Sequence, residues 1–242
     1  MEFDTSFIAS VPIIAGLLMS VLHVVSGPDH LAAVTPLAIE SKKKSWLVGL
    51  VWGIGHVLGM LLLGLLFVLF KQYINIDIIS AYGEQLVGFL LIAIGVWSVL
   101  RVIKSQRKIG QHSHPHAHNG DVHIHSHEHG KEHSHTHTHQ NYYKQNIFTA
   151  MVIGIVHGVA GVSHIIAMLP SLALPDTSSS VLYLSGFAAG TILAMLIYAL
   201  ILGIIADRSA VNEKTKSFGI LRLVGGVAAI LVGVWWILLT VI

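Results

Sequence analysis

The sequence predicts an all-α membrane protein with six transmembrane helices that form two inverted three-helix repeats. Three observations lead to this prediction. Apolar residues make up 54% of the chain and charged residues only 11%, whereas about 25% of the residues of a soluble domain are charged. The apolar residues occur in runs long enough to cross a bilayer, which takes about 20 residues. Two of these runs also share one pattern of histidine and glycine.

Six apolar segments follow one another along the chain, and we expect each to form a membrane-spanning helix. Most are rich in Gly, Leu, Ile and Val, which is typical of closely packed membrane helices. The segments are residues 8–39, 46–70, 79–103, 147–173, 180–206 and 218–241. Polar residues interrupt the first and the fourth. The start, MEFDTSF, lacks the basic region of a cleaved signal peptide, so we expect the first helix to remain as a membrane anchor.

Lysine and arginine are distributed unevenly between the loops. Only Lys71 lies on the side that holds both termini and the loops after the second and fourth segments. Arg222 lies near the start of the sixth segment. The loops after the first, third and fifth segments carry Lys42, Lys43, Lys44, Arg101, Lys104, Arg107, Lys108, Lys131, Lys144, Arg208, Lys214 and Lys216. By the positive-inside rule, we expect both termini outside and the long central loop in the cytoplasm. The expected location is the plasma membrane, the inner membrane in a bacterium, as a multi-pass protein.

The two interrupted segments match each other without a gap. HVVSGPDHLAAVTPLA (23–38) and HGVAGVSHIIAMLPSL (157–172) share H-x3-G-x2-H followed by a proline. LVGFLLIAIGVW (86–97) and VGGVAAILVGVW (224–235) also agree, while the second and fifth segments match more weakly through G-x4-M. Composition alone could align two Gly-rich helices, an alternative that is strongest for this weaker match. A three-helix unit has an odd number of crossings, so its second copy must cross the membrane in the opposite sense.

The duplication divides the chain into three parts. We expect the first membrane repeat over residues 1–103, a His-rich cytoplasmic loop over residues 104–145, and the second membrane repeat over residues 146–242. Inverted repeats are the plan of many secondary transporters, whose substrate site lies near the membrane midplane at the repeat interface.

Ionisable residues inside membrane helices are rare and usually face a bundle interior or a water-filled path. The candidate metal ligands are His23, Asp29, His30, His56, His157 and His164. Imidazole nitrogens suit Zn²⁺, Cu²⁺, Ni²⁺ and Co²⁺, whereas Ca²⁺ and Mg²⁺ prefer oxygen ligands. Five histidines, one carboxylate and no cysteine therefore predict a site for a divalent transition metal, and it is asymmetric because Thr191 is the counterpart of His56. The alternatives are histidines that only hydrogen-bond between helices, an aspartate paired with a neighbouring helix, and a proton relay.

A helix break is needed if His23 and His30 are to share one ion. Seven residues span about 10.5 Å along a straight helix. Pro28 lacks a backbone donor and disfavours helical dihedral angles at Gly27. We therefore expect an unwound turn that brings His23 close to Asp29 and His30. A weaker break is expected in the second copy, because no proline follows its glycine.

The central loop, HSHPHAHNGDVHIHSHEHGKEHSHTHTH, holds three blocks in which histidine alternates with another residue. Its auxiliary metal ligands are His112, His114, His116, His118, His123, His125, His127, His129, His133, His135, His137 and His139. Low hydrophobicity and repetition predict disorder without metal. Alternation places the rings of each block on one side of an extended chain, which suits metal capture. The sequence leaves open whether the loop senses, buffers or delivers metal, or is only a spacer.

The stretches HVVSGPDHLAAV and GLVWGIGHVLG resemble the nickel/cobalt transporter superfamily, which carries an H-x4-D-H motif in an early membrane helix and a G-H motif in the next. Some exporters of that superfamily also carry a His-rich loop. The resemblance implies transport of Ni²⁺ or Co²⁺, with His23, Asp29, His30 and His56 as binding or selectivity residues. The motif in this chain is H-x5-D-H, and the acidic motif of the uptake permeases is not evident. The chain is therefore similar to a divergent member, close to membrane proteins that accompany urease or handle nickel.

The preferred interpretation is a secondary transporter of a divalent transition metal, Ni²⁺ or Co²⁺, and not an enzyme. The sequence has no G-x4-G-K-[ST] motif for ATP, so a proton gradient, the membrane potential or a separate partner would drive transport. We expect no prosthetic group and no nucleic-acid partner. The expected partners are the metal ion, the lipid bilayer and a cytoplasmic metal chaperone or nickel enzyme. The alternatives are an exporter of Zn²⁺ or another divalent cation, a non-transporting metal-delivery or storage protein, and a metalloenzyme, which usually needs more carboxylates than Asp29 alone.

Overall fold

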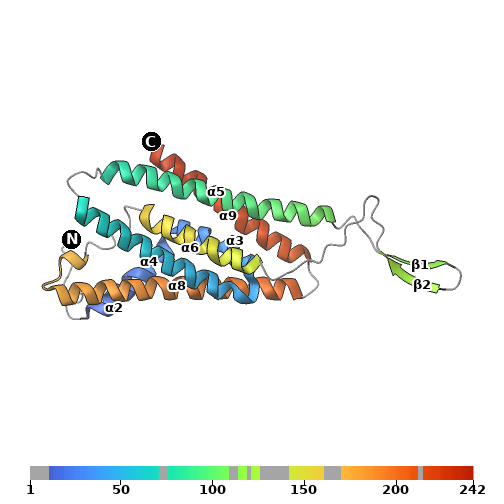
Figure 1. Ribbon diagram of the computed structural model, residues 1–242, viewed down its shortest axis with the longest axis horizontal. Helices are drawn as coiled ribbons and strands as arrows, with labels where there is room; N and C mark the ends of the chain where they lie inside the picture. The colour runs from blue at the N-terminus through green and yellow to red at the C-terminus, as the bar shows by residue number, and fades with distance from the viewer. Residues whose placement is uncertain are drawn as a thin grey trace.

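The described residues form a bundle of long helices and a short β-hairpin that lies beyond one end of the bundle (Figure 1). The computed structural model describes residues 11–70, 76–108, 114–118, 121–125, 142–160, 170–211 and 215–241. The longer elements are α2 (Pro12–Ser26), α3 (Pro28–Ser41), α4 (Ser45–Phe70), α5 (Ile76–Lys108), α6 (Tyr142–Ala160), α8 (Thr177–Val211) and α9 (Thr215–Val241). A single turn of 3₁₀-helix, Lys42–Lys44, separates α3 from α4.

Four described segments have the length and apolar composition needed to cross a membrane. They are Pro28–Leu66, Tyr82–Ser105, Thr177–Ala210 and Lys216–Leu239. Helices α2 and α6 are also apolar but shorter. Many large apolar side chains on these helices are exposed on the outside of the bundle, Leu61 and Leu231 among them. Such a surface suits contact with lipid, so the prediction of a helical membrane protein is confirmed.

The first predicted span consists of two helices. Helix α2 ends at Ser26, Gly27 is extended with φ −91° and ψ 95°, and α3 begins at Pro28. Proline suits the first position of a helix because its missing N–H would be unpaired there anyway. The predicted break is therefore confirmed. In the second copy α6 ends at Ala160, and the matching break at Gly161 lies outside the described residues.

Helix α3 lies at the centre of the bundle. Its residues Ala33, Val34, Leu37 and Ala38 are almost completely buried, and it contacts every other long helix of the described chain. The most extensive helix pairs are α4 with α6, α5 with α9, and α2 with α8. The metal-ligand candidates Asp29 and His30 begin α3, so this packing carries them into the core.

Glycines allow the closest of these helix contacts. A Cβ atom placed on Gly95 of α5 would lie 2.5 Å from the carbonyl oxygen of Gly226 on α9, and one on Gly88 would lie 2.8 Å from that of Gly233. Both distances are shorter than any real Cβ contact, so only glycine fits without a shift of one helix. Small residues at membrane helix interfaces let backbones approach in this way.

A charge cluster around the buried Glu40 joins α3 to α5 and α9 at the far end of α3. The Glu40 side chain is 4% exposed. Arg101 donates from Nη1 to Glu40 Oε2 at 3.1 Å, and Arg222 approaches both carboxylate oxygens, with Nε 2.6 Å from Oε1 and Nη2 2.7 Å from Oε2. The Arg222 guanidinium also lies over the Phe218 ring, 4.3 Å from its centroid. One carboxylate thus neutralises part of the charge of two arginines from different helices.

Outside the bundle core, Asp176 caps the start of α8. Its carboxylate accepts hydrogen bonds from the Ser179 backbone N–H at 2.8 Å and from the Ser179 hydroxyl at 2.9 Å. These hydrogen bonds favour the ionised form and lower the pKa of Asp176 below its ordinary value.

The predicted His-rich loop is partly structured. Helix α5 continues to Lys108 and α6 begins at Tyr142, so both helices extend into the range 104–145. Basic residues in the last turn of α5 favour this extension, because they interact well with the helix C-terminus. Between the helices, β1 (His114–His118) and β2 (Asp121–His125) pair antiparallel, and they lie away from the bundle in Figure 1. The other residues of the loop lie outside the described ranges.

Candidate metal site

Five of the six predicted membrane ligands come together in the core of the bundle. They come from four helices: His23 from α2, Asp29 and His30 from α3, His56 from α4, and His157 from α6. All are buried except His23, which is partly exposed. The close glycine contacts between α4 and α6 allow this convergence, since Gly59 and Gly158 sit against backbone atoms of the opposite helix.

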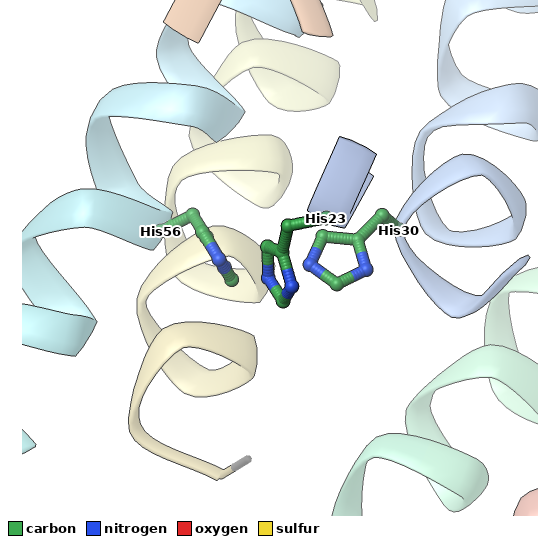
Figure 2. Close-up of side chains that lie close together, drawn as sticks. All are labelled: His23, His30 and His56. Carbon is green, nitrogen blue, oxygen red and sulfur yellow. The ribbon is translucent and has the colours of Figure 1, made fainter. Parts of the chain in front are cut away.

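The five residues form two ligand sets that share His30. One set is His23, His30 and His56, and the other is Asp29, His30 and His157. Within each set, one ligand atom per residue lies within 4.8 Å of the others. Figure 2 shows the rings of His23, His30 and His56 turned toward one another from three helices. The His30 ring is the hub, with its centroid 4.7 Å from that of His23, 5.0 Å from that of His56 and 4.8 Å from that of His157.

Asp29 links the two halves of the chain. Its Oδ1 lies 3.0 Å from His30 Nδ1, and its Oδ2 lies 3.0 Å from His157 Nε2. A buried carboxylate is costly unless such partners stabilise it.

Two aromatic residues that the sequence reasoning missed complete the site. Trp52 is fully buried and stacks on His56, with ring centroids 4.8 Å apart and planes at 9°, and it lies 5.5 Å from His157. Phe187 lies 5.7 Å from His23. The Trp52 indole N–H has no hydrogen-bond partner among the residues that the structure describes. The spacing of Trp52 and His56, four residues apart on one helix face, is the signal that would have found it.

The remaining predicted ligands are not part of this cluster. His164 lies outside the described residues, so its position stays a prediction. Of the loop histidines, His114, His116, His118, His123 and His125 lie in the two strands. The rest, His112, His127, His129, His133, His135, His137 and His139, lie outside the described ranges.

The donor set fits a divalent transition metal better than an alkaline-earth ion. Nitrogen donors dominate, with a single carboxylate, whereas Ca²⁺ and Mg²⁺ require mostly oxygen donors. The same contacts would also serve a purely structural role, in which Asp29 pairs α3 with α6. The geometry and the donor chemistry therefore identify a candidate metal site.

Comparison with known proteins places the chain in a family. The sequence model of the cytochrome c biogenesis protein transmembrane region matches residues 11–235. The chain belongs to this family. The match covers both ligand sets and the His-rich segment between His56 and His157. The sequence contains no cysteine.

Curated relatives of this family member come from plants and bacteria. The chain is 36% identical over 200 residues to the chloroplast protein FOR GROWTH AND FERTILITY 1 of Arabidopsis thaliana and 33% identical over 201 residues to FOR GROWTH AND FERTILITY 2, with 82% of the chain covered each time. It spans about half of those proteins, 51% and 48%. It is also 31% identical to the urease accessory protein UreH of Bacillus sp. (strain TB-90), over 78% of the chain and 75% of that protein.

No solved structure matches the chain. The resemblance of its histidine motif to nickel/cobalt transporters stays a prediction, because the matching family carries a different description.

Proposed function

We propose that this protein is a secondary transporter of a divalent transition metal ion, with Ni²⁺ or Co²⁺ as the favoured cargo. The observation that carries the proposal is the pair of ligand sets that share His30 in the core of the bundle. Ligands in the middle of a membrane bundle are expensive and are usually retained for an ion or proton path. Two adjacent sets give one ion two neighbouring positions, which suits passage more than permanent storage.

The packing supports the inverted repeat on which this proposal depends. In the alignment of the two halves, α2 corresponds to α6 and α4 to α8, so the α2–α8 contact is the counterpart of the α4–α6 contact, and both are extensive. The reciprocal pairs Gly88–Gly233 and Gly95–Gly226 also exchange under this alignment. Inverted repeats bind their substrate at the repeat interface, where His157 of the second half approaches Asp29 of the first.

The aromatic contacts of the site follow the same relation. Phe187 is the counterpart of Trp52, and His157 is the counterpart of His23. The contact of His23 with Phe187, at 5.7 Å, therefore corresponds to that of His157 with Trp52, at 5.5 Å. His56 of α4 does not follow this correspondence, since its counterpart Thr191 has no metal-binding nitrogen.

The relatives bear on the choice of metal. One of them is a urease accessory protein, and a nickel-related membrane role for this chain agrees with that similarity. We propose that the chain lies in the plasma membrane with the His-rich segment in the cytoplasm, where that segment collects metal ions. A cytoplasmic metal chaperone or nickel enzyme would then be its protein partner.

Metal flux into liposomes tests the function directly. The purified chain is reconstituted, and uptake of Ni²⁺, Co²⁺ and Zn²⁺ is measured against empty liposomes. We expect saturable flux of Ni²⁺ or Co²⁺, and its loss in His30→Ala, because His30 belongs to both ligand sets. Asp207→Asn is the matched control, since Asp207 lies outside the site, 3.9 Å from the exposed Lys43.

Absence of flux together with tight metal binding would replace the transporter with a storage or delivery protein. Flux of Zn²⁺ alone would assign a different cargo. Unchanged flux in His30→Ala would place the path elsewhere in the molecule.

A further inference from the structure

The β-hairpin brings histidines of two separate sequence blocks into direct opposition. Its register pairs His114 with His125 and His116 with His123, and His118 with Asp121. Residues directly opposite each other in an antiparallel pair share a face, with Cβ atoms about 4.5–5.5 Å apart. Five histidines and one aspartate therefore occupy one face of the hairpin.

The opposite face carries a different chemistry. The remaining pairs are Pro115 with Ile124 and Ala117 with Val122, so all four positions of that face are apolar. The hairpin is thus two-sided, with imidazole and carboxylate positions on one face and apolar positions on the other. Nothing in a simple His-rich spacer would require the histidines and the apolar residues to lie on opposite faces in both strands.

The sequence itself favours this register. The two residues between the strands are Asn119 and Gly120, the dipeptide that most strongly signals a two-residue hairpin connection. In such a hairpin the pair next to the connection exchanges hydrogen bonds and the pairs then alternate. Pro115 therefore falls at a non-hydrogen-bonded position, where its missing N–H costs nothing.

We propose that residues 114–125 form a metal-nucleated hairpin that holds a divalent transition metal ion between the opposed pairs His114–His125 and His116–His123. Imidazole nitrogen coordinates Zn²⁺ at about 2.0–2.1 Å and is also a ligand of Ni²⁺ and Cu²⁺, so opposed imidazoles can reach one ion, and the two pairs supply four nitrogen donors. An isolated two-stranded hairpin is marginally stable in water. The bound ion would cross-link the strands and stabilise the fold of the segment, as metal does in small metal-dependent domains. This site does not depend on the proposed transport function.

Exchanges of neighbouring residues test the register without changing composition. The double exchange His116→Ala/Ala117→His with Ile124→His/His125→Ile keeps all 17 histidines. It removes both opposed histidine pairs and creates no new one, since positions 117 and 124 are not partners. The matched control makes the same kind of exchange in the third block: His135→Thr/Thr136→His with Thr138→His/His139→Thr.

Ni²⁺ binding to the detergent-purified full chain is measured by equilibrium dialysis. We expect the hairpin exchange to weaken the tightest loop site at least tenfold, roughly the least that loss of a supporting residue costs a metal site, and the control to leave it unchanged. Equal binding by both variants, or equal weakening in both, would overturn the proposal, because histidine number and not register would then decide affinity.

Cross-linking provides a readout that does not involve the histidines. The chain lacks cysteine, and non-hydrogen-bonded pairs have the Cβ separation that a disulfide needs. We expect Ala117→Cys/Val122→Cys to oxidise to an internal disulfide faster with Ni²⁺ than without it. The mismatched pair Ala117→Cys/Ile124→Cys is expected to oxidise slowly in both conditions. Equal rates for the two pairs would contradict the register.

Discussion

Among single residues, Asp29 connects the two halves of the candidate site. It is the carboxylate of the described core cluster, and it holds His30 from its own helix and His157 from α6 at 3.0 Å each. In the proposed site, its negative charge would compensate part of the charge of a divalent ion within the buried core. Its two oxygens each contact one ring nitrogen, Oδ1 that of His30 and Oδ2 that of His157, and such contacts orient imidazole rings in metal sites.

Replacing Asp29 by Asn should lower metal affinity while keeping the fold. Asparagine has nearly the same shape but no charge, so we expect Ni²⁺ affinity to fall by about tenfold or more. Isothermal titration of the detergent-purified protein measures this, and thermal unfolding checks that the bundle is intact. Asp207→Asn should titrate like the wild type. If both variants bind equally, the Asp29 pairs are structural only.

At the scale of elements, the glycines decide how closely two helices approach. The α5–α9 pair uses reciprocal contacts between Gly95 and Gly226 and between Gly88 and Gly233. By contrast, a Cβ placed on Gly64 of α4 would meet nothing within 4 Å. Replacing glycine is therefore expected to have opposite effects on stability at these two places.

Gly95→Ala should destabilise the protein and Gly64→Ala should not. The first change forces α5 and α9 apart, at a cost of about 1–3 kcal/mol, as in other overpacked interfaces. The second gains helix propensity, up to about 1 kcal/mol. Thermal unfolding in one detergent compares them. A loss of stability in Gly64→Ala as large as that in Gly95→Ala would contradict the packing.

The Glu40 cluster also connects separate helices, because Glu40 on α3 contacts Arg101 on α5 and Arg222 on α9. Glu40→Gln removes the negative charge that the guanidiniums of Arg101 and Arg222 both contact. Arg101 is 31% exposed and Arg222 18% exposed, so we expect a loss of about 1–3 kcal/mol, less than for a fully buried pair. Asp207→Asn, which breaks one exposed pair, should cost at most about 1 kcal/mol. Thermal unfolding measured at several salt concentrations checks this result, because screening affects exposed pairs more.

For the whole molecule, the central question is which end faces the cytoplasm. The starting end of α2 and the final end of α9 lie at the end of the bundle opposite to the hairpin (Figure 1). The lysines of residues 42–44 directly precede α4, which begins at the hairpin end of the bundle, whereas α8 begins after Asp176 at the opposite end (Figure 1). The positive-inside rule predicts that the hairpin end is cytoplasmic.

Single introduced cysteines test this orientation, because the chain has no cysteine that would give background labelling. We expect a membrane-impermeant maleimide to label Ser178→Cys in intact cells. Lys44→Cys should be labelled only after the membrane is permeabilised. Both positions are exposed. The opposite labelling pattern would reverse the predicted topology and place the His-rich segment outside.

Local sequence determined a good part of this molecule. Apolar runs set the helices, and the observed bounds of α4, α5, α8 and α9 differ from the expected ones by a few residues. Gly27-Pro28 determined the break between α2 and α3, since proline and the residue before it restrict the backbone by sterics alone. The histidines of the apolar segments and Asp29 could be predicted as site residues because ionisable residues inside membrane helices are costly and rare.

Only the tertiary structure decided which of these groups meet. His157 reaches Asp29 across 128 positions of sequence, Trp52 covers the histidines, and Arg222 pairs with Glu40 from the opposite end of the chain. Such contacts depend on how helix surfaces fit together, and no local pattern encodes the fit. In the hairpin, similarly, alternation placed histidines on one side of each block, but the strand register decided which histidines of the two blocks stand opposite each other. Local rules fix the backbone of each segment, whereas close packing fixes the partners of its side chains.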